Sequence, residues 1–198
     1  MAQIADRTQE LLIQKQGFQF VVGVDEAGAG ALAGPVVAGA VILDAANPIV
    51  GLGDSKLLTE KRREKLYAEI ILNAKAWAFG MATVEEIEVL GIRPANYLAM
   101  RRAVEKIPDA QFALVDAWTI PQLQIPQQGI IRGDRSIACI AAGSIIAKVT
   151  RDRMMTDLHA QFPEYGLKIH NGYGTKAHRD AIKEHGPSAI HRMSFTLI

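Results

Sequence analysis

Short apolar runs rich in β-branched residues recur along the first two-thirds of the chain. Residues 18–24, 35–43 and 77–83 each predict a strand, because an apolar run bounded by turn-forming residues is typical of a buried strand. Only a short connection separates the first two runs, which predicts that they pair as a hairpin. Two further strands are expected at residues 111–115 and 129–132.

Helical periodicity fills the segments between and after these strands. Thr59 is expected to cap a helix that ends near Leu72. The apolar face of that helix would carry Leu66, Tyr67, Ile70 and Ile71. Pro94 lies early in a second helix that runs to about Lys106, and residues 140–160 predict a long third helix. Strands first, and then strands alternating with helices, predict a mixed sheet with helices on its faces.

Length and composition favour one domain. The 198 residues are 49% hydrophobic, enough for one sizeable core, so residues 1–198 are expected to form a single domain. Residues 1–17 form an N-terminal extension without the apolar segment of a secretory signal, and no apolar run is long enough to span a membrane. Cys139 lies in an apolar stretch and is expected to be a buried thiol. We therefore expect a cytoplasmic monomer with no membrane partner.

Charge is unevenly distributed, although the net charge is only +1. Residues 1–131 carry 12 Lys and Arg against 15 Asp and Glu, whereas residues 132–198 carry 10 against 6. All five histidines also fall in the second segment. This pattern is compatible with a basic face for nucleic acid or with an ordinary solvated surface.

Four acidic residues follow predicted strands. Asp25 and Glu26 end the first, Asp116 ends the fourth, and Asp134 lies just beyond the fifth. Four such groups at one sheet edge would repel one another by about 3 to 4 kcal/mol per close pair at an effective dielectric of about 20. A divalent cation resolves that repulsion, and oxygen-only ligands indicate Mg²⁺ or Mn²⁺ and not zinc.

Each acid also has a purely structural interpretation. Asp134 would serve equally well as a helix cap. Asp25 and Glu26 are neighbours, and neighbouring side chains of a regular strand point to opposite faces. Both can reach one site only if the strand ends there.

The glycines at positions 28, 30 and 34 follow the first acid pair. Glycine lets a ligand approach the backbone closely and leaves N–H groups open to phosphate or sugar oxygens. A strand and not a helix is expected after them, so the pattern is not a dinucleotide-binding fingerprint. A plain tight turn remains the alternative.

Several motifs occur together in a fixed order. They are GVDEAG, GDSK at 53–56, LVDA at 114–117, RGD at 132–134, IAAGSIIAKVTRD at 140–152, GYGTKAH and IHRMSF. In order and spacing the chain resembles bacterial ribonuclease HII from about residue 18 to residue 195. The resemblance implies a ribonuclease H-like α/β fold, with a mixed five-stranded sheet flanked by helices and a helical C-terminal region. It argues against the HIII relatives, which have a long N-terminal extension and Glu as the last acid.

The resemblance also implies an activity. Asp25, Glu26, Asp116 and Asp134 would be the catalytic metal ligands of a two-metal site. The expected enzyme is an endoribonuclease that hydrolyses the RNA strand of RNA/DNA hybrids and cuts 5′ of ribonucleotides embedded in duplex DNA. It would leave 5′-phosphate and 3′-hydroxyl ends and act in DNA repair and replication, by removing ribonucleotides and RNA primers.

Substrate contacts follow from the same resemblance. Gly28, Ala29 and Gly30 would grip the ribonucleotide and its 2′-hydroxyl, by which RNA is told from DNA. Tyr173 would lie against the deoxyribose on the 3′ side, within a substrate-binding region of about residues 160–198. Lys56 is a further substrate-binding candidate.

Three departures from the family pattern leave an alternative open. Ala29 and Asn171 replace an expected Arg and Lys, and Ser136 replaces a commonly basic residue. The chain could be a catalytically attenuated nucleic-acid-binding variant, or other cations could compensate. The candidate cations are Lys56, Arg132, Arg135, Lys168 and Lys176. A glycosidase with two carboxylates is a weaker rival, because it leaves two acids unexplained and aromatic residues are only 6% of the chain.

Overall fold

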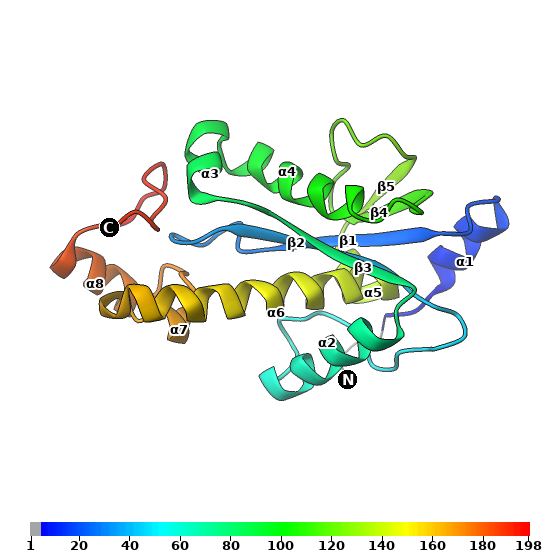
Figure 1. The fold of residues 1–198 in the computed structure, drawn as a ribbon, viewed down its shortest axis with the longest axis horizontal. Helices are drawn as coiled ribbons and strands as arrows, with labels where there is room; N and C mark the ends of the chain where they lie inside the picture. The colour runs from blue at the N-terminus through cyan, green and yellow to red at the C-terminus, as the bar shows by residue number, and fades with distance from the viewer. Residues whose placement is uncertain (1–4) are drawn as a thin grey trace.

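The fold is built on one five-stranded sheet with the order β3-β2-β1-β4-β5 (Figure 1). The computed structural model describes residues 5–198. The strands are β1 (Val21–Ala27), β2 (Val36–Ile42), β3 (Ala76–Ala82), β4 (Phe112–Asp116) and β5 (Gln127–Ile130). β2 pairs antiparallel with both β1 and β3, whereas β4 pairs parallel with both β1 and β5. The predicted mixed sheet and the predicted hairpin are both confirmed.

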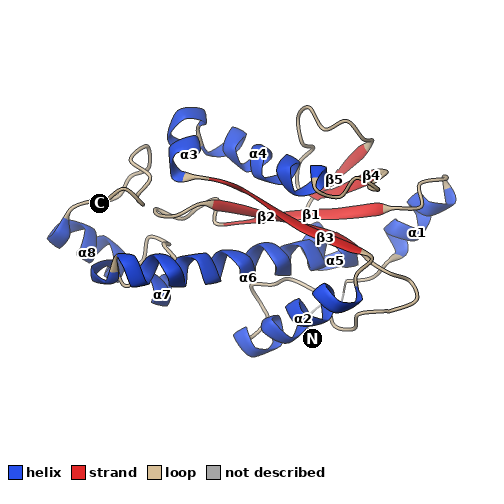
Figure 2. Cartoon of the chain, viewed as in Figure 1, coloured by secondary structure: helices blue, strands red, loops and turns tan. Residues whose placement is uncertain are grey.

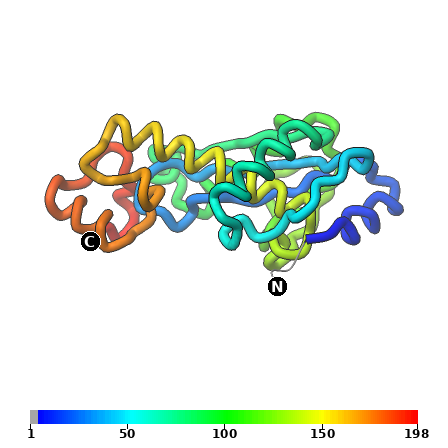
Figure 3. Tube along the Cα trace, turned by 90° about the horizontal axis from the view of Figure 1, so that it is seen from below, coloured from blue at the N-terminus to red at the C-terminus, as the bar shows by residue number. Residues whose placement is uncertain are grey.

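Helices cover both faces of this sheet (Figure 2). The helices are α1 (Thr8–Lys15), α2 (Glu60–Asn73), α3 (Val84–Leu90), α4 (Ile92–Glu105), α5 (Gly133–Ser136), α6 (Ala138–Gln161), α7 (Leu167–His170) and α8 (Lys176–His185), with a 3-10 turn, η1 (Pro163–Tyr165). α3 and α4 lie on one face, and α2 and α6 lie on the other. The C-terminal helices α7 and α8 lie at one end of the molecule and α1 at the opposite end (Figure 3).

Some predicted boundaries need correction. The first strand begins at Val21 and continues through the acid pair to Ala27, so the acids are part of the strand and do not follow it. β5 begins two residues earlier than predicted. Thr59 does cap α2 by accepting from the Arg62 N–H, but Ile71 is 38% exposed and its assignment to the buried face is wrong.

Glycines bring α6 directly onto the sheet. A Cβ added to Gly23 in β1 would lie 2.1 Å from the backbone of Cys139, and one on Gly39 in β2 would lie 2.2 Å from the Gly143 carbonyl oxygen. Only residues without a side chain permit that approach. The close contact sets α6 across the middle of the sheet and thereby places its side chains beside the acids of β1.

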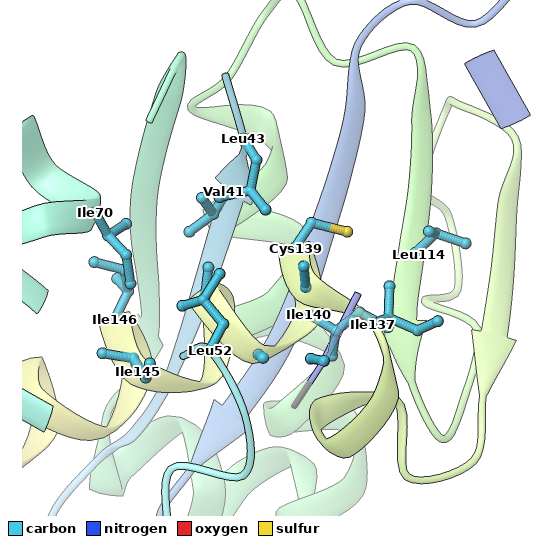
Figure 4. Packing of buried hydrophobic residues seen from close by; sticks show 14 of the residues in the cluster. Val41, Leu43, Leu52, Ile70, Leu114, Ile137, Cys139, Ile140, Ile145 and Ile146 are labelled. Carbon is cyan, nitrogen blue, oxygen red and sulfur yellow. The ribbon is translucent and has the colours of Figure 1, made fainter. Parts of the chain in front are cut away.

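Apolar side chains on the α6 face form a continuous core (Figure 4). Leu114 of β4, Val41 of β2 and Ile140 of α6 are all fully buried there. Cys139 is also fully buried, which confirms the prediction of a buried thiol. Within residues 5–198, no helix is both long enough and apolar enough to cross a membrane.

The N-terminal extension contains a helix that the sequence reasoning missed, and its first four residues lie outside the described part of the chain. Glu10 of α1 is buried, and its carboxylate accepts the backbone N–H of Cys139 at 2.9 Å. The Ala138 N–H donates to the Asp6 carbonyl at 2.8 Å. α6 has no cap of its own at Ile137, so the extension supplies partners for two of the unpaired donors of its first turn.

Candidate active site

Two acids from β1 approach the site from opposite faces of the sheet. Asp25 lies beside Ser144 on α6, whereas Glu26 lies beside Asn96 on α4. The alternation expected of a regular strand therefore holds. Both carboxylates are nevertheless repelled by the same third carboxylate, Asp116, because β1 ends one residue later at the sheet edge.

Asp116 and Asp134 are joined by a backbone contact. Asp116 is the last residue of β4, and its Oδ1 accepts the N–H of Gly133 at 2.7 Å. Gly133 opens α5, so this bond holds the short helix that carries Asp134 against the end of β4. Asp134 lies inside the helix, and the cap position belongs to Arg132 in a left-handed conformation. The helix-cap interpretation of Asp134 is therefore wrong.

The acids raise one another's pKa values. Burial raises the pKa of Asp25 well above its usual value, and repulsion from Glu26 and Asp116 adds to it. Burial and the charge of Asp116 likewise raise the pKa of Glu26. The pKa of Asp134 is raised by burial, then by Asp116 and Asp54. Ionised carboxylates at this edge are thus costly without a counter-charge.

Asp54 is a fifth acid that the sequence reasoning did not single out. It is buried, and its carboxylate pairs with Arg135 at 3.2 Å and accepts the Lys56 N–H at 2.9 Å. The side chain of Lys56 adds positive charge to the group. Burial opposes that charge, but Asp25, Asp134 and other carboxylates outweigh it and raise the pKa of Lys56. The GDSK motif contained the signal, since it places an acid two residues before a lysine.

A cleft of about 530 Å³ opens beside the acids. It is lined by Glu26 and by every residue predicted to bind substrate: Gly28, Ala29, Gly30, Lys56 and Tyr173. Two cations that the sequence reasoning had not assigned, Arg63 and Lys148, also line it. Lys148 pairs with Asp152 at 2.7 Å, and Arg63 donates to the Leu58 carbonyl. The lining of the cleft therefore combines one acid, Glu26, with the three cations Lys56, Arg63 and Lys148.

The glycine-rich loop between β1 and β2 forms one wall of this cleft. Gly28 has a positive φ of 92°, whereas a Cβ on Gly30 would meet nothing within 4 Å. Gly28 is needed for conformation and space, while Gly30 borders open space where a ligand can approach. A strand follows the loop, as predicted, so it does not serve as a dinucleotide-binding turn.

The donor set suits a hard divalent cation, since it consists of carboxylates that repel one another. Among residues 5–198, no three acidic, histidine or cysteine side chains are already arranged as a chelate. Mutual repulsion favours such spreading of the carboxylates. Binding an ion would therefore require them to rotate toward a common point.

Comparisons with known proteins identify the family. The model of ribonuclease HII matches residues 22–198. Ribonuclease HII of Burkholderia pseudomallei (strain 668) is 53% identical over 178 residues, which is 89% of this chain and 83% of that protein, and the protein of Burkholderia thailandensis matches equally well. The chain belongs to the ribonuclease HII family. It is thus a hydrolytic endoribonuclease acting on RNA/DNA hybrids, and the glycosidase interpretation is wrong.

Solved structures of ribonuclease HII proteins share the fold. In the PCNA:RNase HII complex from Archaeoglobus fulgidus, the matched chain is 25% identical with a TM-score of 0.77, over 90% of this chain and 96% of that one. Ribonuclease H2 from Pyrococcus horikoshii OT3 is 27% identical with a TM-score of 0.74, over 89% and 94%. Bst-RNase HIII in complex with Mn²⁺ is 18% identical with a TM-score of 0.72, over 90% of this chain and only 67% of that one, so it shows the fold alone.

Proposed function

We propose that this ribonuclease HII family member cuts 5′ of single ribonucleotides in duplex DNA, in addition to RNA in hybrids, and that it serves ribonucleotide and RNA primer removal. One observation carries the proposal: Glu26, one of the four acids, lines the same cleft as the glycine loop and Tyr173. Residues 1–198 would form a single ribonuclease H-like catalytic domain, with residues 1–17 as an N-terminal extension and about residues 160–198 as its substrate-binding region.

In this proposal Asp25, Glu26, Asp116 and Asp134 hold two Mg²⁺ or Mn²⁺ ions. When bound, such ions supply Lewis-acid charge at the scissile phosphate and lower the pKa of water. The protein's own contribution is positional: the Glu26 N–H orients Asp25, and the Gly133 N–H orients Asp116. The raised pKa values support the assignment, since perturbed carboxylates concentrate at functional sites.

Recognition would use the opposite wall of the cleft. The backbone of Gly28, Ala29 and Gly30 would contact the 2′-hydroxyl, and Tyr173 would pack on the neighbouring sugar. Tyr173 is 36% exposed, which leaves part of its ring free for that contact. Lys56 and Lys148 would neutralise phosphates beside the acids.

The deciding experiment is cleavage of a DNA duplex with one embedded ribonucleotide, in Mg²⁺, in Mn²⁺ and in chelator. We expect metal-dependent cleavage 5′ of the ribonucleotide, with 3′-hydroxyl and 5′-phosphate ends, because the 2′-hydroxyl is held for recognition and does not attack the phosphate. Products ending in a 2′,3′-cyclic phosphate would refute this scheme. Size-exclusion chromatography and cell fractionation would check the accompanying proposal of a cytoplasmic monomer.

The attenuated variant is the second candidate, and the replaced cations favour it. Ala29 and Asn171 remove two charges from positions next to the glycine loop and Tyr173. Arg63 and Lys148 in the cleft, together with Lys56, favour the active enzyme instead. Specific binding of the ribonucleotide duplex without metal-dependent cleavage would identify the attenuated variant.

A further inference from the structure

Two arginines beneath the cleft are buried without a carboxylate partner. Arg151 of α6 and Arg192 near the C-terminus both have no exposed surface. Within residues 5–198, neither forms an ion pair. Arginine is almost never fully buried unless its charge is paired, so the partners of these guanidiniums need an explanation.

Both guanidiniums bind backbone carbonyls of the glycine-rich loop. Arg192 donates to the Gly34 carbonyl from Nε at 3.0 Å and from Nη2 at 2.8 Å, and to the Ala29 carbonyl from Nη1 at 3.0 Å. Arg151 donates to Pro35 at 2.9 Å and to Ala33 at 3.0 Å. Four carbonyls of one short loop therefore surround two cations.

Arg151 also reaches the segment that carries Tyr173. Its Nη1 donates to the Asn171 carbonyl at 2.8 Å, and its guanidinium lies 5.5 Å from the centre of the Tyr173 ring. The Leu32 N–H donates to the Gly172 carbonyl at 2.8 Å. Arg151 therefore joins two walls of the cleft, the glycine-rich loop and the segment that carries Tyr173.

Glycines make room for this arrangement. A Cβ on Gly28 would lie 1.9 Å from Nε of Arg151, and one on Gly172 would lie 2.6 Å from the Ala33 carbonyl oxygen. Both glycines have positive φ, at 92° and 78°. The lack of a side chain at Gly28 and Gly172 makes room for the guanidinium and for the contact between the loop and the Tyr173 segment. Of the loop glycines 28, 30 and 34, only Gly30 borders open space.

The contact of Arg192 with Ala29 fixes the direction of a peptide group. A trans peptide is planar, with its C=O and N–H pointing in opposite directions. Because the Ala29 carbonyl points toward the buried Arg192, the N–H of Gly30 points the opposite way, toward the cleft. No backbone hydrogen bond among the described residues uses that N–H. A cation on the carbonyl also polarises the peptide, which makes its N–H a stronger donor.

We propose that Arg192 and Arg151 are positioning residues that aim and polarise the Gly30 N–H toward the ribose 2′-oxygen and hold Tyr173 at a fixed distance from it. The proposal rests on the proposed function. Neither arginine touches the substrate, and both act through backbone carbonyls. Their effect is therefore on the choice between ribonucleotide and deoxyribonucleotide, and not on general affinity for duplexes.

The test compares Arg192→Lys and Arg151→Lys with Arg179→Lys as a matched control. Arg179 also donates to two backbone carbonyls, those of Thr196 and Leu197, but neither belongs to the cleft. The readout is affinity, in Ca²⁺, for two duplexes that differ only in one 2′-hydroxyl. We expect Arg192→Lys to lower the preference for the ribonucleotide about five- to tenfold, the worth of one good hydrogen bond, and to change affinity for the all-DNA duplex less than about twofold.

Different results would contradict the proposed role of the two arginines and the proposed function of the protein. A lower melting temperature with an unchanged preference in both lysine variants would overturn the proposal and make the arginines purely structural. A wild-type protein without any ribonucleotide preference would instead overturn the proposed function. Arg179→Lys should leave the preference unchanged, and an equal loss there would also contradict the proposal.

Hydrogen exchange on the wild-type protein covers the case in which the lysine variants do not fold. The N–H groups of Leu32 and Gly34 bond to Gly172 and Ile190, and that of Arg192 bonds to Leu32. If the arginines hold the two walls as one unit, these amides share one protection factor. Nearly unprotected exchange of Leu32 and Gly34 beside a protected α6 would overturn the proposal.

Discussion

Buried charge is handled in opposite ways at the two sides of the cleft. Arg192 donates to carbonyls from all three of its guanidinium nitrogens, so its charge is satisfied by the protein itself. Asp25 and Glu26 instead face other carboxylates, which raises their pKa values on top of the effect of burial. A buried charge that is hydrogen-bonded by the protein stabilises the fold. A buried charge beside like charges is instead available to bind a ligand of opposite charge.

The largest expected effect comes from removing one charge on the acidic side. Asp134→Asn is nearly isosteric and should lower kcat about a thousandfold or more, since several kcal/mol of charge stabilisation is lost at about 1.4 kcal/mol per tenfold. Asp116→Asn should behave alike. The melting temperature should stay the same or rise, because repulsion among the acids is relieved. Steady-state cleavage and thermal unfolding check both expectations. Normal activity with a lower melting temperature would show that Asp134 is structural.

A second prediction concerns the buried histidines beside Tyr173. His178 donates from Nδ1 to the Tyr173 carbonyl, and its Nε2 lies 3.2 Å from Nε2 of His191. Burial lowers the pKa of His178 to about 4, with His170 and His191 also opposing its charge. The pKa in the fold is below the unfolded value of about 6.5, so the stabilisation is complete above pH 6.5 and is lost as the pH falls toward 4.

The loss should be on the order of 2 to 3 kcal/mol between pH 7 and pH 4.5, from about 1.36 kcal/mol per pKa unit. Urea unfolding at the two pH values measures it. His178→Asn removes the titrating ring and should reduce the difference. The same change in stability between the two pH values in the wild-type protein and in His178→Asn would contradict the prediction.

Adding cations to the cleft should have a smaller effect. Ala29→Arg with Asn171→Lys restores the two charges that the family pattern has at these positions, and Ala29 lines the cleft. Two recovered phosphate contacts should steepen the fall of log affinity with log salt by up to about 1.8, and binding should be tighter at every salt concentration. Titrations at several salt concentrations provide the measurement, and an unchanged slope and affinity would show that the loop does not meet a phosphate there.

The smallest expected effect is at the turn after β4. Ala117 has a φ of 59°, a left-handed conformation that costs a residue with a Cβ about 1 kcal/mol or more. Ala117→Gly should therefore raise the free energy of unfolding by up to about 1 kcal/mol and leave cleavage unchanged. If instead activity fell while stability rose, the strain beside Asp116 would be part of the site.

Much of the fold was predictable because its signals are local. β2, β3 and β4 coincide with apolar runs to within one or two residues, and α6 coincides with the long apolar segment. The segment TVEE contained the capping box of Thr83 and Glu86, which would have indicated the missed helix α3. α1 was missed because its stability comes from the Glu10 contact with α6, which is distant in sequence.

The site was predictable only in part, because some of its contacts join residues that are distant in sequence. The four acids were found because they follow apolar runs. Gly28 and Gly30 were indicated by the glycine pattern, and the role of Tyr173 came from the family resemblance. The roles of those residues remain predictions. Arg151 and Lys148 interrupt an apolar helix, which is a visible signal, but what a guanidinium binds depends on a loop more than a hundred residues away. Such a partner cannot be read from a local pattern.

The span of the Arg192 contact has a consequence for the order of folding. Arg192 and Ala29 are separated by 163 residues, so the loop is braced only once two segments far apart in the sequence have come together. A partly folded chain in which Arg192 has not yet docked carries Asp25, Glu26, Asp116 and Asp134, but its glycine-rich loop is not braced by Arg192. Contacts of such long range also form slowly, because closing a large loop costs entropy before the contact repays it. In the proposed scheme, selectivity for the ribonucleotide is therefore acquired late in folding.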